Sequence, residues 1–65
     1  MLKESRKKAG MTQAELAKEI GVWQGCVANY EAGIRTPSLK MAVAIIKALK
    51  KRKVKMDISE LLPSN

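Results

Sequence analysis

The chain has 65 residues, which is enough for one small domain over residues 1–65 and too few for a second. It contains no histidine and one cysteine, so it offers neither a disulfide framework nor a set of metal ligands, and we expect no enzyme, cofactor or metal. Thirteen lysines and arginines against six acidic residues give a net charge of +7, which favours a polyanion as the partner.

The first two predicted helices lie on either side of Gly10. Residues 1–9 are short and basic and predict a helix that ends at this glycine. Thr12 and Glu15 have the spacing of a capping box, so a second helix begins there, and its apolar residues Leu16, Ala17 and Ile20 share one face. Gly21 ends this helix, because glycine adopts the left-handed conformation that a side chain disfavours.

A third helix is predicted to begin near Gln24 and to run to about residue 31. Helical periodicity divides its residues between two faces, with Val27, Tyr30 and Glu31 on one side and Gly25 and Asn29 at the centre of the other. One face therefore packs against the chain, and the opposite face is presented to solvent.

Residues 12–33 have the spacing of a helix-turn-helix. Ala17 is small where the helices cross, Gly21 makes the turn, and Val27 fixes the second helix. Leu16, Ile20, Val22 and Tyr30 fill the other inward positions, and the segment resembles the DNA-binding element of the Cro and phage-repressor family, also called the XRE family. The resemblance implies an all-α fold of five short helices, a lambda-repressor-like DNA-binding domain with the helix-turn-helix at its centre.

The resemblance also implies that the presented face of the third helix enters the major groove, where each base pair shows a distinct pattern of donors and acceptors. Gln24 is the main expected base contact, because its amide can donate and accept at adenine. The other expected base contacts are Trp23, Gly25, Cys26, Ala28 and Asn29. Trp23 replaces the usual capping residue, and its indole either contacts DNA or folds onto the second helix. The expected phosphate contacts are Gln13, Arg35, Thr36, Ser38 and Lys40.

A structural ion pair is implied by the same resemblance. Arg6 stands four residues before Gly10, where the family has an arginine that pairs with a glutamate near the end of the third helix, here Glu31. A buried Glu31 needs such a partner for its charge. The alternative is that Arg6 is one more solvated cation on a helix surface.

Ser38 is predicted to cap a fourth helix over residues 39–49. The basic segment that follows, residues 50–55 with the sequence KKRKVK, departs from the resembled family, which has a short loop there. Three interpretations stay open for it: a solvated loop, a contact with the DNA backbone, or an extended segment in which Val54, Met56 and Ile58 share one face.

A fifth helix is predicted over residues 57–62, because Asp57 and Glu60 have the spacing of a capping box. The region from about residue 50 to residue 65 is also where we expect two copies to meet, through Leu49, Val54, Met56 and Ile58. Six cations between residues 47 and 55 repel one another across such a contact, so the predicted homodimer is weak and is promoted by DNA.

The favoured interpretation is a small dimeric repressor, Cro-like and of phage or prophage origin, that occupies an operator in double-stranded DNA. An antitoxin or another regulator that also binds a protein partner is the alternative. A nonspecific binder of RNA or anionic membranes is a third hypothesis, and the ordered polar face of Gln24 and Asn29 argues against it. The longest apolar run, residues 41–46, is far shorter than the ~20 residues of a membrane span, so we expect a cytoplasmic protein with no membrane or small-molecule partner.

Overall fold

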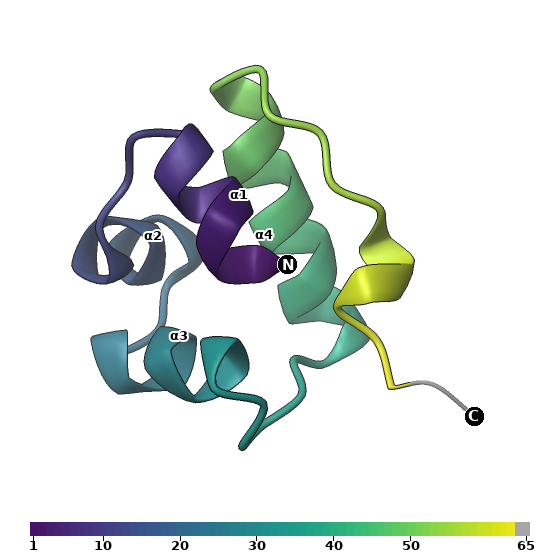
Figure 1. Ribbon diagram of the computed structural model, residues 1–65. Coiled ribbons are helices and arrows are strands. Elements are labelled where there is room, and N and C mark those ends of the chain that lie inside the picture. The colour runs from purple at the N-terminus through teal and green to yellow at the C-terminus, as the bar shows by residue number, and fades with distance from the viewer. Residues whose placement is uncertain (64–65) are drawn as a thin grey trace.

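A computed structural model describes residues 1–63 of the chain. Its elements are four α-helices and one short 3₁₀ helix, in the order α1 (Leu2–Lys8), α2 (Gln13–Ile20), α3 (Gln24–Glu31), α4 (Leu39–Lys51) and η1 (Ile58–Glu60) (Figure 1). The described residues 1–63 contain no strand, so the fold is all-helical over this range. The expected count of five α-helices was wrong, because the closing element is a single 3₁₀ turn.

The closing element is short for a local reason. Asp57 caps it by accepting a hydrogen bond from the backbone N–H of Ser59 at 3.0 Å, but Pro63 follows only six residues later. The residue before a proline disfavours the helical conformation, so too few positions remain to propagate an α-helix. By contrast, α4 runs two residues past its predicted end at residue 49, into the basic segment.

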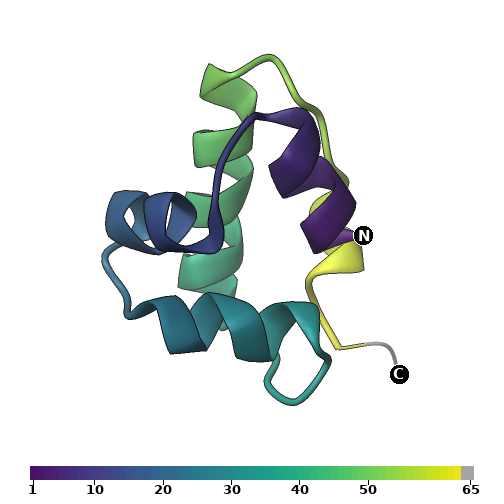
Figure 2. The ribbon, with the colours of Figure 1, turned by 60° about the vertical axis from the view of Figure 1, so that its left-hand side comes forward.

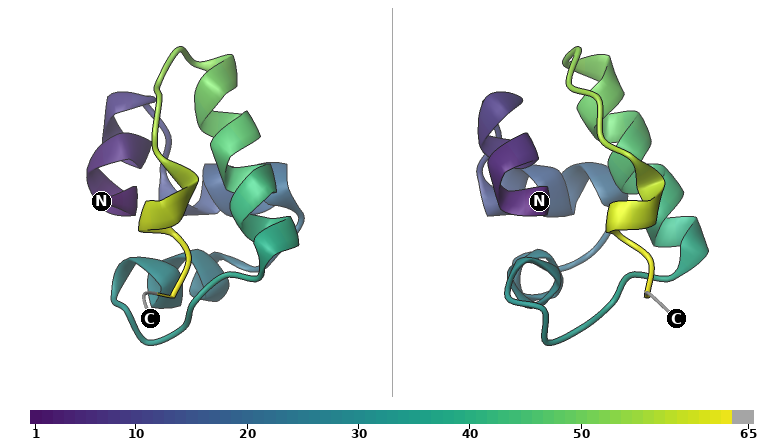
Figure 3. Two further views of the ribbon diagram at one scale, coloured as in Figure 1. Left: turned by 90° about the vertical axis from the view of Figure 1, so that its right-hand side faces the viewer. Right: turned by 45° about the vertical axis from the view of Figure 1, so that its right-hand side comes forward.

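The core lies between α2, α3 and α4. Its four largest fully buried side chains are Leu16 of α2, Val27 of α3, and Ile45 and Leu49 of α4. α1 and the closing turn complete the core with Leu2 and Leu61. Figures 2 and 3 show the result: α3 lies along one end of the molecule, and the C-terminal ends of α1 and α4 lie at the opposite end.

The turn between α2 and α3 forms as predicted. Thr12 and Glu15 make a reciprocal capping box that starts α2. Gly21 ends α2 with φ +80°, and the N–H of Val22 then donates to the carbonyl oxygen of Ala17 at 2.9 Å. The chain therefore reverses sharply and packs α3 against α2.

The turn after α4 uses a lysine where α2 uses a glycine. Lys53 has φ +60° and is the one non-glycine residue among residues 1–63 with a positive φ. The left-handed conformation costs a residue with a side chain roughly 1 kcal/mol more than it costs glycine. The N–H of Val54 closes the turn by donating to the carbonyl oxygen of Leu49 at 3.0 Å.

Residues 54–58 run back along α4 without forming a strand. Val54, Met56 and Ile58 are half-buried against the core, and Lys55 and Asp57 between them are exposed. This alternation matches the extended interpretation of the segment. Among residues 1–63, no helix is both long and apolar enough to cross a membrane.

Candidate DNA-binding surface

One face of α3 is free of the core and carries no charge. Gln24 and Gly25 at its start are exposed, and Cys26, Ala28 and Asn29 are half-buried. Val27 on the opposite face has no exposed surface. Glu31, at the end of α3, is the charged residue of this helix. The presented face can therefore contact another molecule through hydrogen bonds and shape, and not through charge.

Neither the packing nor the backbone conformation of the chain requires a glycine at position 25. A Cβ placed there would meet no atom within 4 Å, and its φ lies outside the left-handed region. Glycine inside a helix costs about 1 kcal/mol relative to alanine. The gain is exposed backbone that another molecule can approach closely.

A buried ion pair lies behind α3. Arg6 Nε donates to Glu31 Oε2 at 2.6 Å, and Arg6 Nη2 donates to Glu31 Oε1 at 3.2 Å. The two side chains are only 8% and 5% exposed, so Arg6 is not a solvated surface cation. Arg6 Nη1 also donates to the carbonyl oxygen of Met11 at 2.7 Å, so one guanidinium fixes α3 and the link between α1 and α2.

Both partners stay charged. Burial acts to raise the pKa of Glu31, but hydrogen bonds from Arg6 and Gln13 and the nearby positive charges outweigh it, and the pKa lies below its ordinary value. The hydrogen bond to Glu31 raises the pKa of Arg6 above its ordinary value. The pair therefore keeps one positive and one negative charge in contact behind the presented face.

A line of side chains joins this ion pair to Gln24. Gln13 Nε2 donates to Glu31 Oε1 at 3.0 Å, and Gln24 Nε2 donates to Gln13 Oε1 at 3.4 Å, a longer and weaker contact. A carboxamide has two N–H donors, so Gln24 keeps one N–H and its oxygen free. Sequence reasoning assigned Gln13 to a phosphate and missed this contact; the available signal was glutamine at the first position of both helices.

Trp23 immediately precedes α3 and is 85% exposed. It occupies the N-cap position without a side-chain hydrogen bond to the helix, so the cap is lost as expected. Such exposure is incompatible with an indole folded onto α2. The interpretation that folds Trp23 onto α2 is therefore wrong, and its contact with DNA stays a prediction.

Four of the five residues expected at phosphates lie between α3 and the first turn of α4, at the same end of the molecule as α3 (Figure 3). These four are exposed: Arg35, Thr36, Ser38 and Lys40. The fifth, Gln13, is half-buried in α2. The carbonyl oxygen of Asn29 accepts from the N–H groups of Ile34 and Arg35 and ties this loop to α3. The hydroxyl of Ser38 accepts from the N–H of Met41 at 3.2 Å and caps α4.

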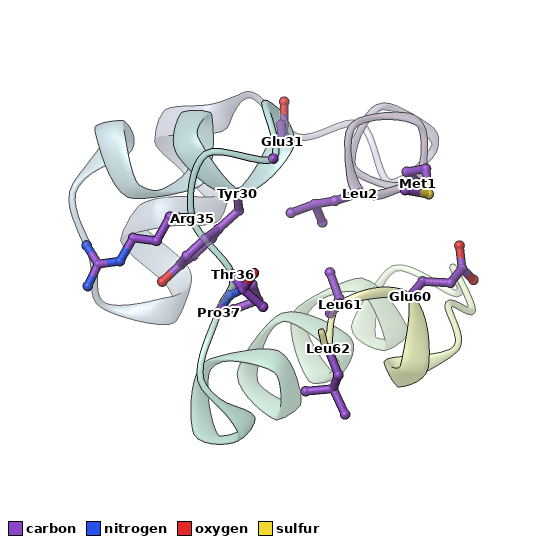
Figure 4. Close-up of a pocket in the computed structure, with 11 residues that line it drawn as sticks. Met1, Leu2, Tyr30, Glu31, Arg35, Thr36, Pro37, Glu60, Leu61 and Leu62 are labelled. Atoms are coloured by element: carbon purple, nitrogen blue, oxygen red, sulfur yellow. The ribbon is translucent and has the colours of Figure 1, made fainter. Parts of the chain in front are cut away.

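A small cleft of about 190 Å³ opens beside the end of α3 (Figure 4). Tyr30 and Glu31 of α3 line it together with Arg35, Met1 and Leu62. Small-molecule sites usually occupy about 300–1,000 Å³, so this cleft is below the usual size. Within residues 1–63, no group of three or more histidine, cysteine or acidic side chains could hold a metal ion.

The residues expected between two copies lie mostly against the chain itself. Leu49 is fully buried in the core, so it has no surface to offer, and its assignment to an interface is corrected. Val54, Met56 and Ile58 are half-buried against the same core. Three of the exposed apolar side chains lie together in the chain between α3 and the first half of α4: Ile34, Leu39 and Val43, which are 75%, 62% and 37% exposed.

The fold and the presented face of α3 define a small helix-turn-helix domain. The family model described as helix-turn-helix matches residues 2–55. The chain belongs to this family, of the XRE type.

Relatives in two archaea agree with this assignment. A protein of Archaeoglobus fulgidus, described as an uncharacterized HTH-type transcriptional regulator, is 41% identical over 51 residues, which cover 78% of this chain and 73% of the relative. A protein of Methanothermobacter thermautotrophicus with the same description is 41% identical over 49 residues, 75% of this chain and 71% of the relative. No solved structure gave a significant match.

Proposed function

We propose that the protein is a transcriptional repressor that binds an operator in double-stranded DNA as a dimer, with one α3 helix in the major groove of each half-site. The observation that carries this proposal is the position of Gln24, exposed at the start of α3 and joined through Gln13 to the buried ion pair. The relatives described as transcriptional regulators support the same class of function. Nothing in these relatives bears on a phage origin, which stays a prediction.

The free groups of Gln24 suit adenine. Its remaining N–H can donate to adenine N7 while its oxygen accepts from adenine N6, which is the usual amide pairing in the major groove. Gly25 beside it lets the helix backbone come close to the bases. Arg35 and Lys40 supply charge at phosphates, which fixes the position of α3 without reading the sequence.

Selection of bound duplexes from a random-sequence pool tests this function. We expect enrichment of two half-sites related by a dyad, about 34 Å or one helical turn apart, each with an adenine at a fixed position. Recovery of unselected sequence would show a nonspecific binder and contradict the proposal. A stoichiometric protein partner recovered with the protein from its host would favour the alternative, a regulator that also binds protein.

The dimer contact is best placed on the exposed apolar residues near the start of α4. Leu39 and Val43 lie one helical turn apart, and Ile34 precedes them in the loop beside α3. Lys40 is the sole charged residue in the first half of α4, so two copies that meet here avoid the repulsion expected between residues 47 and 55. The apolar surface is small, so we expect a weak dimer that DNA promotes.

Val43→Asp is expected to reduce binding to the full palindrome at least tenfold and to spare binding to a single half-site. A carboxylate at this surface would face its own copy across the dyad, and like charges repel. Titrations on palindrome and half-site duplexes measure both quantities. Met56→Asp is the control, since Met56 packs on its own core; if that variant alone lost cooperative binding, the interface would lie at the originally predicted segment.

A further inference from the structure

Lysines gather at the end of the molecule where α1 and α4 finish. Lys7 and Lys8 end α1, Lys50 and Lys51 end α4, and two more lysines follow α4. All six are exposed, and we call them the basic pole: Lys7, Lys8, Lys50, Lys51, Lys53 and Lys55. Figures 1, 2 and 3 agree that the C-terminal ends of α1 and α4 point away from the end of the molecule that carries α3.

The helix dipole explains only part of this cluster. Cations in the last turn of a helix are favoured by its dipole, which accounts for the four lysines within α1 and α4. Lys53 and Lys55 lie outside both helices. Lys53 takes the left-handed conformation that glycine adopts more easily, so the chain keeps a charge at the expense of a strained backbone. Strain at an exposed residue is a basis for a functional hypothesis about its side chain.

Acidic residues neutralise little of the basic pole. Glu19 accepts from Arg52 at 2.7 Å and 3.1 Å and lies 3.8 Å from Lys51 Nζ. This ion pair ties the turn after α4 to α2. Among residues 1–63, the other five lysines of the pole take part in no ion pair.

A duplex under α3 cannot be the target of this charge. The 13 residues of α4 span about 20 Å at about 1.5 Å per residue, and α4 separates the loop beside α3 from the basic pole. The Debye length at physiological salt is about 8 Å, so the intervening distance screens the pole from phosphates at the other end. If these cations have a polyanion as their partner, it is a second one.

We propose that the basic pole binds a second segment of duplex DNA without sequence preference, so that the protein holds two DNA segments at opposite ends. This inference rests on the proposed function, because a protein bound to an operator is already surrounded by neighbouring DNA at a high effective concentration. Lysines bind phosphates without contacting bases, and the pole as defined consists of lysines, so the proposed binding needs no particular sequence.

A capture assay with the full chain tests the second DNA site. A selected operator duplex is fixed to beads, and recovery of a labelled, unrelated duplex from solution is measured as a function of salt. The pole variant combines Lys50→Gln, Lys53→Gly and Lys55→Gln. We expect it to bind the operator within twofold of the parent, to capture the labelled duplex at least tenfold less, and to lower the salt slope of capture by about 2 to 3.

Two matched variants separate charge from folding and from α3. Lys53→Gly alone removes one cation and relieves the strained turn, so its melting temperature should equal or exceed that of the parent while capture weakens. Arg35→Gln with Lys40→Gln removes two cations beside α3 and should weaken operator binding instead. This pair of results would support a second site that is independent of α3.

Two outcomes with the operator on the beads overturn the inference, and beads without an operator separate it from the repressor function. Equal capture by parent and pole variant, with binding to duplex RNA and to anionic vesicles also unchanged, would show that bridging runs through two α3 helices. A pole variant that captures DNA normally but no longer binds duplex RNA, or vesicles of anionic lipid, would assign the pole to that other polyanion. If no operator can be selected, the beads carry an unrelated duplex: capture that still depends on the pole would then contradict the repressor function alone, whereas capture that does not would contradict both.

Discussion

Arg6→Met is expected to lower the free energy of unfolding by about 3–5 kcal/mol, because it leaves the buried carboxylate of Glu31 without its partner. It also removes the donor that satisfies the carbonyl oxygen of Met11. A domain of this length has a total stability of roughly 3–10 kcal/mol, so the loss is a large fraction of the total and the variant should melt at a clearly lower temperature than the parent. Thermal and urea unfolding followed by circular dichroism measure the loss.

The double variant Arg6→Met, Glu31→Leu is the control for this ion pair. With both charges replaced by apolar side chains, much of the lost stability should return, although Gln13 and the carbonyl of Met11 lose their partners. If Arg6→Met melted at the temperature of the parent, the ion pair would contribute nothing and Arg6 would behave as a solvated cation.

Gln24→Ala is expected to weaken operator binding by about 1–3 kcal/mol, or roughly 5-fold to 150-fold, and to leave binding to scrambled DNA nearly unchanged. Base contacts carry the discrimination between sequences, and phosphate contacts do not. Parallel titrations on operator and scrambled duplexes at one salt concentration measure the difference.

Two further variants are the controls for Gln24→Ala. Lys40→Gln removes an expected phosphate contact and should weaken binding to both duplexes alike, with the salt slope reduced by about 1. Gln13→Ala removes the contact that holds Gln24 while leaving the Gln24 amide in place, so its loss at the operator should be smaller than that of Gln24→Ala. Equal losses on both duplexes for Gln24→Ala would reduce Gln24 to a positioning role.

Local signals in the sequence predicted the helix-turn-helix well. Thr12 with Glu15 and then Gly21 determine the start and the end of α2 through interactions within a few residues. The end of α4 was harder to place, because Lys50 and Lys51 are good helix formers that also suit the dipole at a C-terminus. Capping-box spacing at Asp57 overstated the last helix, since Pro63 limits how far it can extend.

The arrangement of side chains across helices could not be read from the sequence in the same way. The contact between Gln13 and Gln24 depends on how closely two helix starts approach after the turn at Gly21. The location of the lysines after α4 depends on the direction in which α4 crosses the molecule. Both are properties of packing, and composition and spacing do not specify them.

The exposed position of Trp23 has a practical consequence for spectroscopy. It is the single tryptophan of the chain, and it stands at the entrance to α3 rather than in the core. An indole already surrounded by water emits at nearly the same wavelength before and after unfolding, so its fluorescence will report poorly on the stability of the fold. The same emission should respond strongly when a ligand covers α3, which makes the parent protein its own optical sensor of binding.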